Sequence, residues 1–167
     1  MANTTPFPLN FRNPQVSANA GNSFWTVTGL TAWDAGHWEF IKAVQGNIFA
    51  TVRVPDVIGA VPNARIFLSL AANATTGVAV VQIGSALVRN NDATRTWNPA
   101  SLTNETAVSW TAPGTAYTRL DQSFTLTNQP AAGDEIIVEI LHNGTNGSDN
   151  LAVNLLLMDA WMLIDLA

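Results

Sequence analysis

The stretch from Trp33 to Pro55 constrains the fold more than any other part of the sequence. Within it, apolar side chains recur at every second position in two runs, which is the pattern of half-buried β-strands. These side chains are Trp38, Phe40, Val44, Ile48, Ala50, Val52 and Val54. A loop of Gln45, Gly46 and Asn47 would bring both runs onto one side of a β-hairpin, because Gly and Asn accept the positive φ that such loops need. We therefore predict a hairpin in which Glu39 lies opposite Arg53.

Shorter runs with the same two-residue period fill the rest of the chain, and segments rich in Pro, Gly, Asn and Thr separate them. The predicted strands cover residues 24–30, 65–71, 78–89, 105–111, 117–127, 135–142 and 151–166. The last run has a composition that also suits a helix, but its alternation favours a strand. Many short strands without an amphipathic helix predict an all-β fold, an antiparallel two-sheet β-sandwich with jelly-roll connectivity.

The sequence predicts one folded domain preceded by an arm. Residues 1–22 contain three prolines, with Phe7, Leu9 and Phe11 interleaved between them, and read as an extended N-terminal arm that docks on this chain or on a neighbour. Residues 23–167 form the single β-sandwich domain. A length of 167 residues with 47% hydrophobic content is enough for one core.

Charge and composition argue against several classes of partner. Only 11% of the residues are charged and the net charge is -5, without the cluster of Lys and Arg that a nucleic-acid binder uses to neutralise phosphates. The absence of cysteine removes disulfides and thiolate metal sites. Polar residues interrupt the apolar 151–166 segment, so we expect no membrane span. The first residues lack the pattern of a signal peptide, which predicts synthesis and retention in a host cytoplasm or release by lysis.

The two histidines are candidates for metal ligands or acid-base groups. His37 and Glu39 point to the same side of one predicted strand, a spacing that could hold a metal or a proton-transfer pair. The expected pairing of Glu39 with Arg53 favours a structural interpretation instead. His142 ends another strand, and nothing in the sequence requires it to lie near His37. We therefore predict neither a metal nor a cofactor.

The sequence also favours a non-enzymatic protein. A glycosidase needs two carboxylates across a cleft, but the candidates are expected at outward or turn positions where water solvates the charge. They are Glu105, Asp121, Glu135 and Glu139. The Gly-x-Ser-x-Gly nucleophile elbow and a Gly-rich phosphate loop are both missing from the sequence.

Aromatic residues give a further lead, since the chain has six tryptophans. We assign Trp25, Trp38 and Trp161 to the core. Trp97, Trp110 and Tyr117 are not assigned to the core, and an exposed ring of this kind could stack on the apolar face of a sugar.

Four segments carry a resemblance to a known group of proteins. They are Trp33-Asp34-Ala35-Gly36-His37-Trp38-Glu39-Phe40, Ala71-Ala72-Asn73-Ala74-Thr75, Asn98-Pro99-Ala100-Ser101-Leu102-Thr103 and Asp159-Ala160-Trp161. With these the chain resembles the β-sandwich virion proteins of tailed bacteriophages, including the jelly-roll capsid decoration, or cement, proteins. The resemblance implies a structural role in the virion in symmetric copies, and it carries over no catalytic residue.

Two functions follow as expectations. The first is a trimeric capsid decoration protein that binds the major capsid protein or another virion protein and stabilises the head across its subunits. The subunit contacts are assigned to Phe7, Leu9, Phe11, Leu156, Met158, Met162 and Ile164. The alternative is a carbohydrate-binding module of a phage tail fibre or adhesin, with Trp97 and Tyr117 as stacking platforms.

Overall fold

The chain folds into β-strands, turns and loops, and its described residues include no helix. The computed structural model describes residues 3–12, 23–30, 33–56, 63–89 and 101–166. Its strands are β1 (Asn3–Pro8), β2 (Asn10–Arg12), β3 (Ser23–Leu30), β4 (Trp33–Phe40), β5 (Gln45–Arg53), β6 (Arg65–Ala72), β7 (Val78–Val88), β8 (Thr103–Asn104), β9 (Val108–Thr111), β10 (Leu120–Thr125), β11 (Glu135–Asn143) and β12 (Leu155–Leu166). No helix within these ranges is long and apolar enough to cross a membrane.

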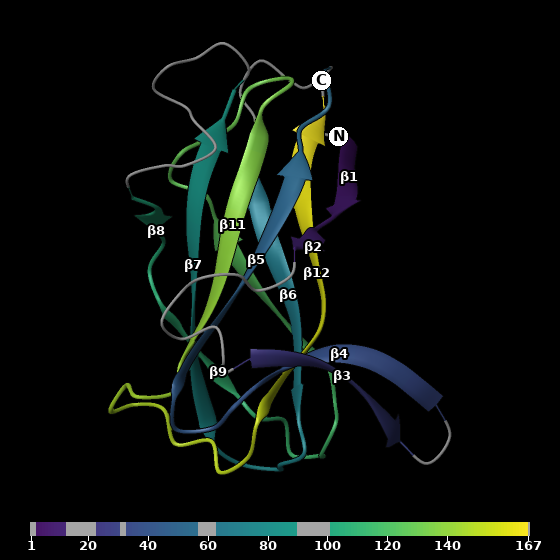
Figure 1. Ribbon diagram of the computed structural model, residues 1–167, viewed down its shortest axis with the longest axis vertical. Helices are drawn as coiled ribbons and strands as arrows, with labels where there is room; N and C mark the ends of the chain where they lie inside the picture. Colours follow the sequence, from purple (N-terminus) through teal and green to yellow (C-terminus); the bar gives the residue numbers. More distant parts are fainter. Residues whose placement is uncertain (1–2, 13–22, 31–32, 57–62, 90–100, 167) are drawn as a thin grey trace.

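The strands form two antiparallel sheets that face each other (Figure 1). Sheet A has the order β10-β6-β12-β4-β3, and β1 also pairs with β12. Sheet B has the order β2-β5-β11-β7-β8, and β9 also pairs with β7. From β4 to β7 successive strands alternate between the sheets, and β10, β11 and β12 alternate in the same way. As a result, neighbouring strands follow the order β4-β12-β6-β10 in sheet A and β5-β11-β7-β9 in sheet B. This is the jelly-roll arrangement, so the predicted fold class is confirmed.

The core lies between the sheets and is built by the period-two alternation. In β11 every second residue is buried, from Ile136 to His142. Strand β4 contributes Trp38 and Phe40 to the same core, and β6 contributes Ile66, Leu68 and Leu70. Burying each large apolar side chain stabilises the fold by about 1.5–3 kcal/mol before entropy is counted. The assignment of Trp38 and Phe40 to the core is confirmed.

The predicted hairpin between residues 33 and 55 is wrong. Strand β4 pairs with β3 and β12 in sheet A, whereas β5 pairs with β11 and β2 in sheet B. The connection between them crosses from one sheet to the other and contains Ala43 at φ 60°. Arg53 therefore lies opposite Glu135, not Glu39. Two strands that face each other across a core show the same alternation as two strands side by side, so the pattern determines the buried faces but not the partners.

The described part of the N-terminal arm docks on its own chain. Strand β1 pairs with the end of β12, with Asn3 opposite Leu166, and β2 pairs with β5 in the other sheet. Between them Leu9 is buried, and its backbone N–H donates to the Ala160 carbonyl at 3.1 Å. The arm thus adds one strand to each sheet and covers backbone groups that an open edge would expose.

Strand β12 organises sheet A. Its first residues lie between β4 and β6, residues 161–163 lie between β1 and β6, and its last residues pair with β1. The register with β6 shifts between Leu157 and Asp159, so Met158 lies at a β-bulge. A bulge re-aims side chains locally. The candidate site lies beside this bulge.

Candidate functional site

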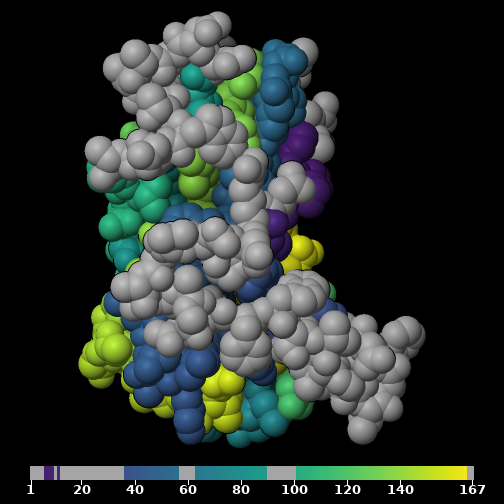
Figure 2. Space-filling model, in the orientation of Figure 1, coloured from purple at the N-terminus to yellow at the C-terminus, as the bar shows by residue number. Residues whose placement is uncertain are grey.

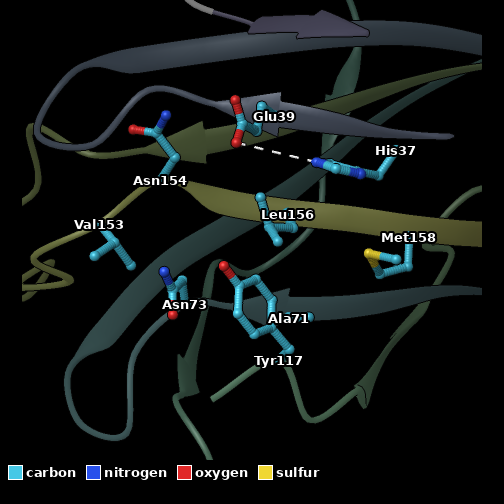
Figure 3. A pocket seen from close by; sticks show the side chains of 9 residues that line it. All are labelled: His37, Glu39, Ala71, Asn73, Tyr117, Val153, Asn154, Leu156 and Met158. Atoms are coloured by element: carbon cyan, nitrogen blue, oxygen red, sulfur yellow. Dashed lines mark ion pairs between the residues drawn. The ribbon is translucent and has the colours of Figure 1, made fainter. Parts of the chain in front are cut away.

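A pocket opens on the outer face of sheet A, the face turned away from sheet B. Its centre is a row across three neighbouring strands, because Leu156 of β12 lies opposite both Glu39 of β4 and Ala71 of β6. None of the three belongs to the core cluster between the sheets. The cavity volume is about 230 Å³. It is lined by His37, Glu39, Ala71, Asn73, Tyr117, Val153, Asn154, Leu156 and Met158 (Figure 3).

One wall of this outer-face pocket comes from β4. His37 and Glu39 share the outer face because they are two residues apart on a strand. His37 is 2% exposed and the Glu39 side chain is 21% exposed, with 4.0 Å between His37 Nε2 and Glu39 Oε1. That separation is too long for a hydrogen bond between these two atoms. Beside them Asn154 is held in place, since its Oδ1 accepts from the Lys42 backbone N–H at 3.0 Å.

Tyr117 forms the opposite wall and has an unusual backbone. Its φ is 59°, in the left-handed region that a bulky side chain rarely adopts. The conformation costs about 1–2 kcal/mol and is held by the Tyr117 backbone N–H, which donates to the Ala72 carbonyl at 2.8 Å. The side chain is nevertheless 42% exposed. In Figure 3 it projects toward the pocket from the side opposite Glu39, with Leu156 between them. Folding alone gives no reason for an aromatic ring at this position.

The lining combines an aromatic ring, an apolar floor and polar groups on both sides. Leu156, Met158 and Ala71 supply the floor, while amides, a carboxylate and an imidazole supply donors and acceptors. Such a site suits a small ligand with one apolar face and a polar edge. Among the described residues Glu39 is the sole carboxylate in this lining. No cluster of three or more His, Cys, Asp or Glu that could hold a metal occurs in the described ranges.

The predicted sites fall in different places. Tyr117 lines the pocket, Trp110 is buried in the core and cannot stack on a sugar, and Trp97 lies outside the described residues. Leu156 and Met158 line the same pocket, and the other predicted subunit contacts pack within this chain. Leu9, Met162 and Ile164 are buried in the core, and Phe7 and Phe11 are partly buried against it. Their assignment to contacts with other subunits stays a prediction.

The assignment of Trp161 to the core is wrong. Its position opposite Pro8 and Phe67 places it on the outer face of sheet A, half-buried. There its ring stacks on Phe67 with 5.5 Å between centroids and 6° between planes. The register shift at Met158 lies between this pair and the outer-face pocket, so counting by twos from the start of the strand gives the wrong face.

The two histidines lie on different sheets. His142 is on β11 with its side chain fully buried, and its Nε2 lies 3.0 Å from Oδ2 of Asp149, which is 2% exposed. His142 Nδ1 has no hydrogen-bond partner among the described residues. Burial lowers the pKa of His142, and this outweighs the opposing effect of Asp149. A neutral imidazole that donates from Nε2 fits these surroundings. The pair is therefore structural.

We expect the stability of the protein to fall as the pH drops below the ordinary histidine pKa of about 6.5. The pKa of His142 is lowered in the folded state, so the unfolded chain binds more protons in this range. The stabilisation is fully present above about pH 6.5 and is lost as the pH falls below it. Urea unfolding on either side of this value measures the trend. His142→Gln, which does not titrate, should flatten the dependence, and an equally steep profile in that variant would contradict the assignment.

The carboxylates that are candidates for catalysis do not gather in one cleft among the described residues. Glu105 is expected from the sequence to be solvated, but it is buried and accepts from the Thr127 backbone N–H at 2.8 Å and from Thr127 Oγ1 at 2.7 Å. Glu135 and Glu139 lie on sheet B, and Asp121 is exposed on β10 of sheet A. Glu105 thus holds two chain segments together and is unavailable for chemistry.

The two polar lining residues Asn73 and Asn154 are not predicted from the sequence, nor are the apolar Ala71 and Val153. Asn73 lies in the turn that follows β6, and Asn154 immediately precedes β12. Their signal in the sequence is weak, because amides of this kind are common in turns for conformational reasons. Only the position of each turn next to the Glu39–Leu156–Ala71 row distinguishes these two asparagines from other amides in turns.

Comparisons with known proteins assign no family. No protein-family model matches the sequence, and no curated protein matches it. Among solved structures, the chain is similar to an Arthrobacter globiformis isomalto-dextranase complexed with panose, at 18% identity and a TM-score of 0.49 over 98% of this chain. The matched part is 23% of that enzyme. A family 35 carbohydrate-binding module of Clostridium thermocellum gives 11% identity and a TM-score of 0.48, covering 97% of this chain and 98% of the module. The CBM22-1 xylan-binding domain of Paenibacillus barcinonensis Xyn10C gives 10% identity and 0.46, covering 99% and 97%.

Proposed function

We propose that this protein binds carbohydrate in the outer-face pocket and that Tyr117 is the surface on which a sugar ring stacks. The observation that carries the proposal is Tyr117 itself. An exposed aromatic side chain is held at φ 59° beside a polar hollow, at a cost in conformational energy that the fold does not recover through core packing. A ligand contact is a physical reason for such an arrangement.

The chemistry of the lining supports a sugar over other small ligands. A pyranose presents C–H groups on one face and hydroxyls around its edge. An aromatic ring can stack on the C–H face, and the side chains of Asn73, Asn154 and Glu39 offer hydrogen-bond donors and acceptors to the hydroxyls. The cavity of about 230 Å³ lies below the range of about 300–1,000 Å³ typical of drug-sized ligands, and it suits one ring at a time.

The proposal is for binding without hydrolysis. Glycoside hydrolysis commonly needs two carboxyl groups on either side of the scissile bond. Glu39 has no second carboxylate facing it among the described lining residues. The capsid decoration role predicted from the sequence stays a prediction. Light scattering, together with sedimentation of the protein with purified capsids, would test it independently of glycan binding.

Tyr117→Gly should weaken binding strongly while leaving the fold intact. Removing the ring eliminates the stacking surface, and we expect affinity to fall at least about tenfold, which is about 1.4 kcal/mol. Glycine accepts φ 59° without strain, and this gain offsets its entropic cost in a loop, so the free energy of unfolding should change by less than about 1 kcal/mol. A glycan array followed by titration calorimetry measures binding, and urea unfolding measures stability.

Two variants make this test specific. Tyr117→Phe keeps the ring and should retain most of the affinity. Leu120→Ala removes another exposed apolar side chain, 47% exposed and three residues away but outside the lining, and should bind like the natural protein. Absence of any glycan ligand would overturn the proposal, as would a Tyr117→Gly variant that binds normally.

A further inference from the structure

We infer that Glu39 makes the outer-face pocket select uncharged and cationic glycans over anionic ones. This inference rests on the proposed function and adds the class of ligand. It follows from the charges on the pocket walls, which the stacking contact alone does not determine.

The described lining carries the Glu39 carboxylate and neither Lys nor Arg, and its histidine, His37, faces Glu39 with 4.0 Å between Nε2 and Oε1. Glu39 has a partly exposed carboxylate, and none of the other eight lining side chains in Figure 3 is Lys or Arg. A bound uronate or sulfate would lose water and meet the like charge of Glu39 without a Lys or Arg partner in the described lining, which is costly. Two like charges in contact near a protein surface repel each other strongly enough to exclude such a ligand.

Two nearby cationic side chains form hydrogen bonds outside the pocket lining. Lys42 is adjacent to Asn154 through its backbone, but its Nζ donates to the Ala152 carbonyl at 3.0 Å. Arg119 follows Tyr117 by two residues, and its Nε donates to Ser69 Oγ at 2.9 Å. Neither side chain belongs to the pocket lining.

Glu39 is also suited to attract the favoured ligands. A carboxylate accepts hydrogen bonds from sugar hydroxyls, and it forms stronger, charge-assisted bonds with an ammonium group. Amino sugars should therefore bind at least as well as their neutral counterparts, while uronates of the same stereochemistry should bind at least about tenfold more weakly.

The experiment compares glycans that differ in charge but share a backbone. We would titrate the full chain with methyl-esterified and de-esterified galacturonan, with a neutral glucan and its sulfated form, and with chitin and chitosan oligosaccharides. In the natural protein every anionic member should bind at least about tenfold more weakly than its neutral partner. In Glu39→Gln this ratio should fall toward one. The difference between the two proteins should shrink as salt is raised.

A charge-matched control separates a local effect from the net charge of the protein. Asp56→Asn removes one negative charge from an 81% exposed side chain beyond sheet B and should leave the ratio unchanged. Tightest binding to anionic glycans, or an unchanged ratio in Glu39→Gln, would overturn the inference. If such anionic binding were lost in Tyr117→Gly, the proposed function would still stand. If no member of any pair bound, both would fall.

Discussion

Gly144→Ala is expected to destabilise the protein by at least about 3 kcal/mol. A Cβ at this position would lie 2.5 Å from the Val44 backbone oxygen and 2.8 Å from the Val44 backbone nitrogen. Real Cβ atoms do not approach so closely, and backbone atoms cannot rotate away as a side chain can. Val44 belongs to the connection that carries the chain from β4 in sheet A to β5 in sheet B. Separating the two segments therefore strains the crossover itself.

A neighbouring glycine provides the control for this prediction. Gly147 lies in the same loop, has no atom within 4 Å of an added Cβ, and does not have positive φ. Gly147→Ala should change stability by less than about 1 kcal/mol, with a small gain if the unfolded chain loses freedom. Figure 2 shows the yellow-green atoms of the loop against blue atoms of the early chain at the lower left. Urea unfolding of both variants measures the contrast, and equal midpoints would contradict this packing.

The sequence was sufficient to predict the buried faces of β4 and β5, but not which strands pair. Trp38 and Phe40 on β4 and Ile48 and Val52 on β5 are in the core as expected. The alternation shows which face of a strand is buried, and both sheets of a sandwich turn an apolar face inward. The choice between a hairpin and a crossover depends on the backbone of residues 41–44, where Ala43 has φ 60° although alanine gives no signal for it.

The wrong hairpin prediction hid the wall of the candidate site that β4 supplies. An assumed pairing with Arg53 made Glu39 look neutralised, whereas the structure places it on the outer face beside Leu156. Tyr117 could be predicted because the sequence does not assign its ring to the core. The strained backbone of Tyr117, which distinguishes it from other exposed aromatic residues, could not be predicted, because it depends on a hydrogen bond to Ala72, which is distant in sequence.

Asp149→Ala is expected to cost about 2–6 kcal/mol, because one buried carboxylate oxygen accepts from two groups. Asp149 Oδ2 lies 2.8 Å from the Val80 backbone nitrogen and 3.0 Å from His142 Nε2. Alanine leaves both donors buried without an acceptor, at about 1–3 kcal/mol each. The loss is measured from the urea midpoint at constant m-value.

Asp149→Asn distinguishes the hydrogen bonds from the charge. An amide oxygen in the place of Oδ2 can accept from both donors, so this variant should lose clearly less stability than Asp149→Ala. The consequence reaches the pocket, since Asp149 and Asn150 fasten the loop to β7 just before Val153 and Asn154 enter the lining. If a glycan is bound there, Asp149→Asn should keep the affinity, while Asp149→Ala should weaken it even at temperatures where the chain is folded. Equal stability of the Ala and Asn variants would show that these two hydrogen bonds do not hold the loop.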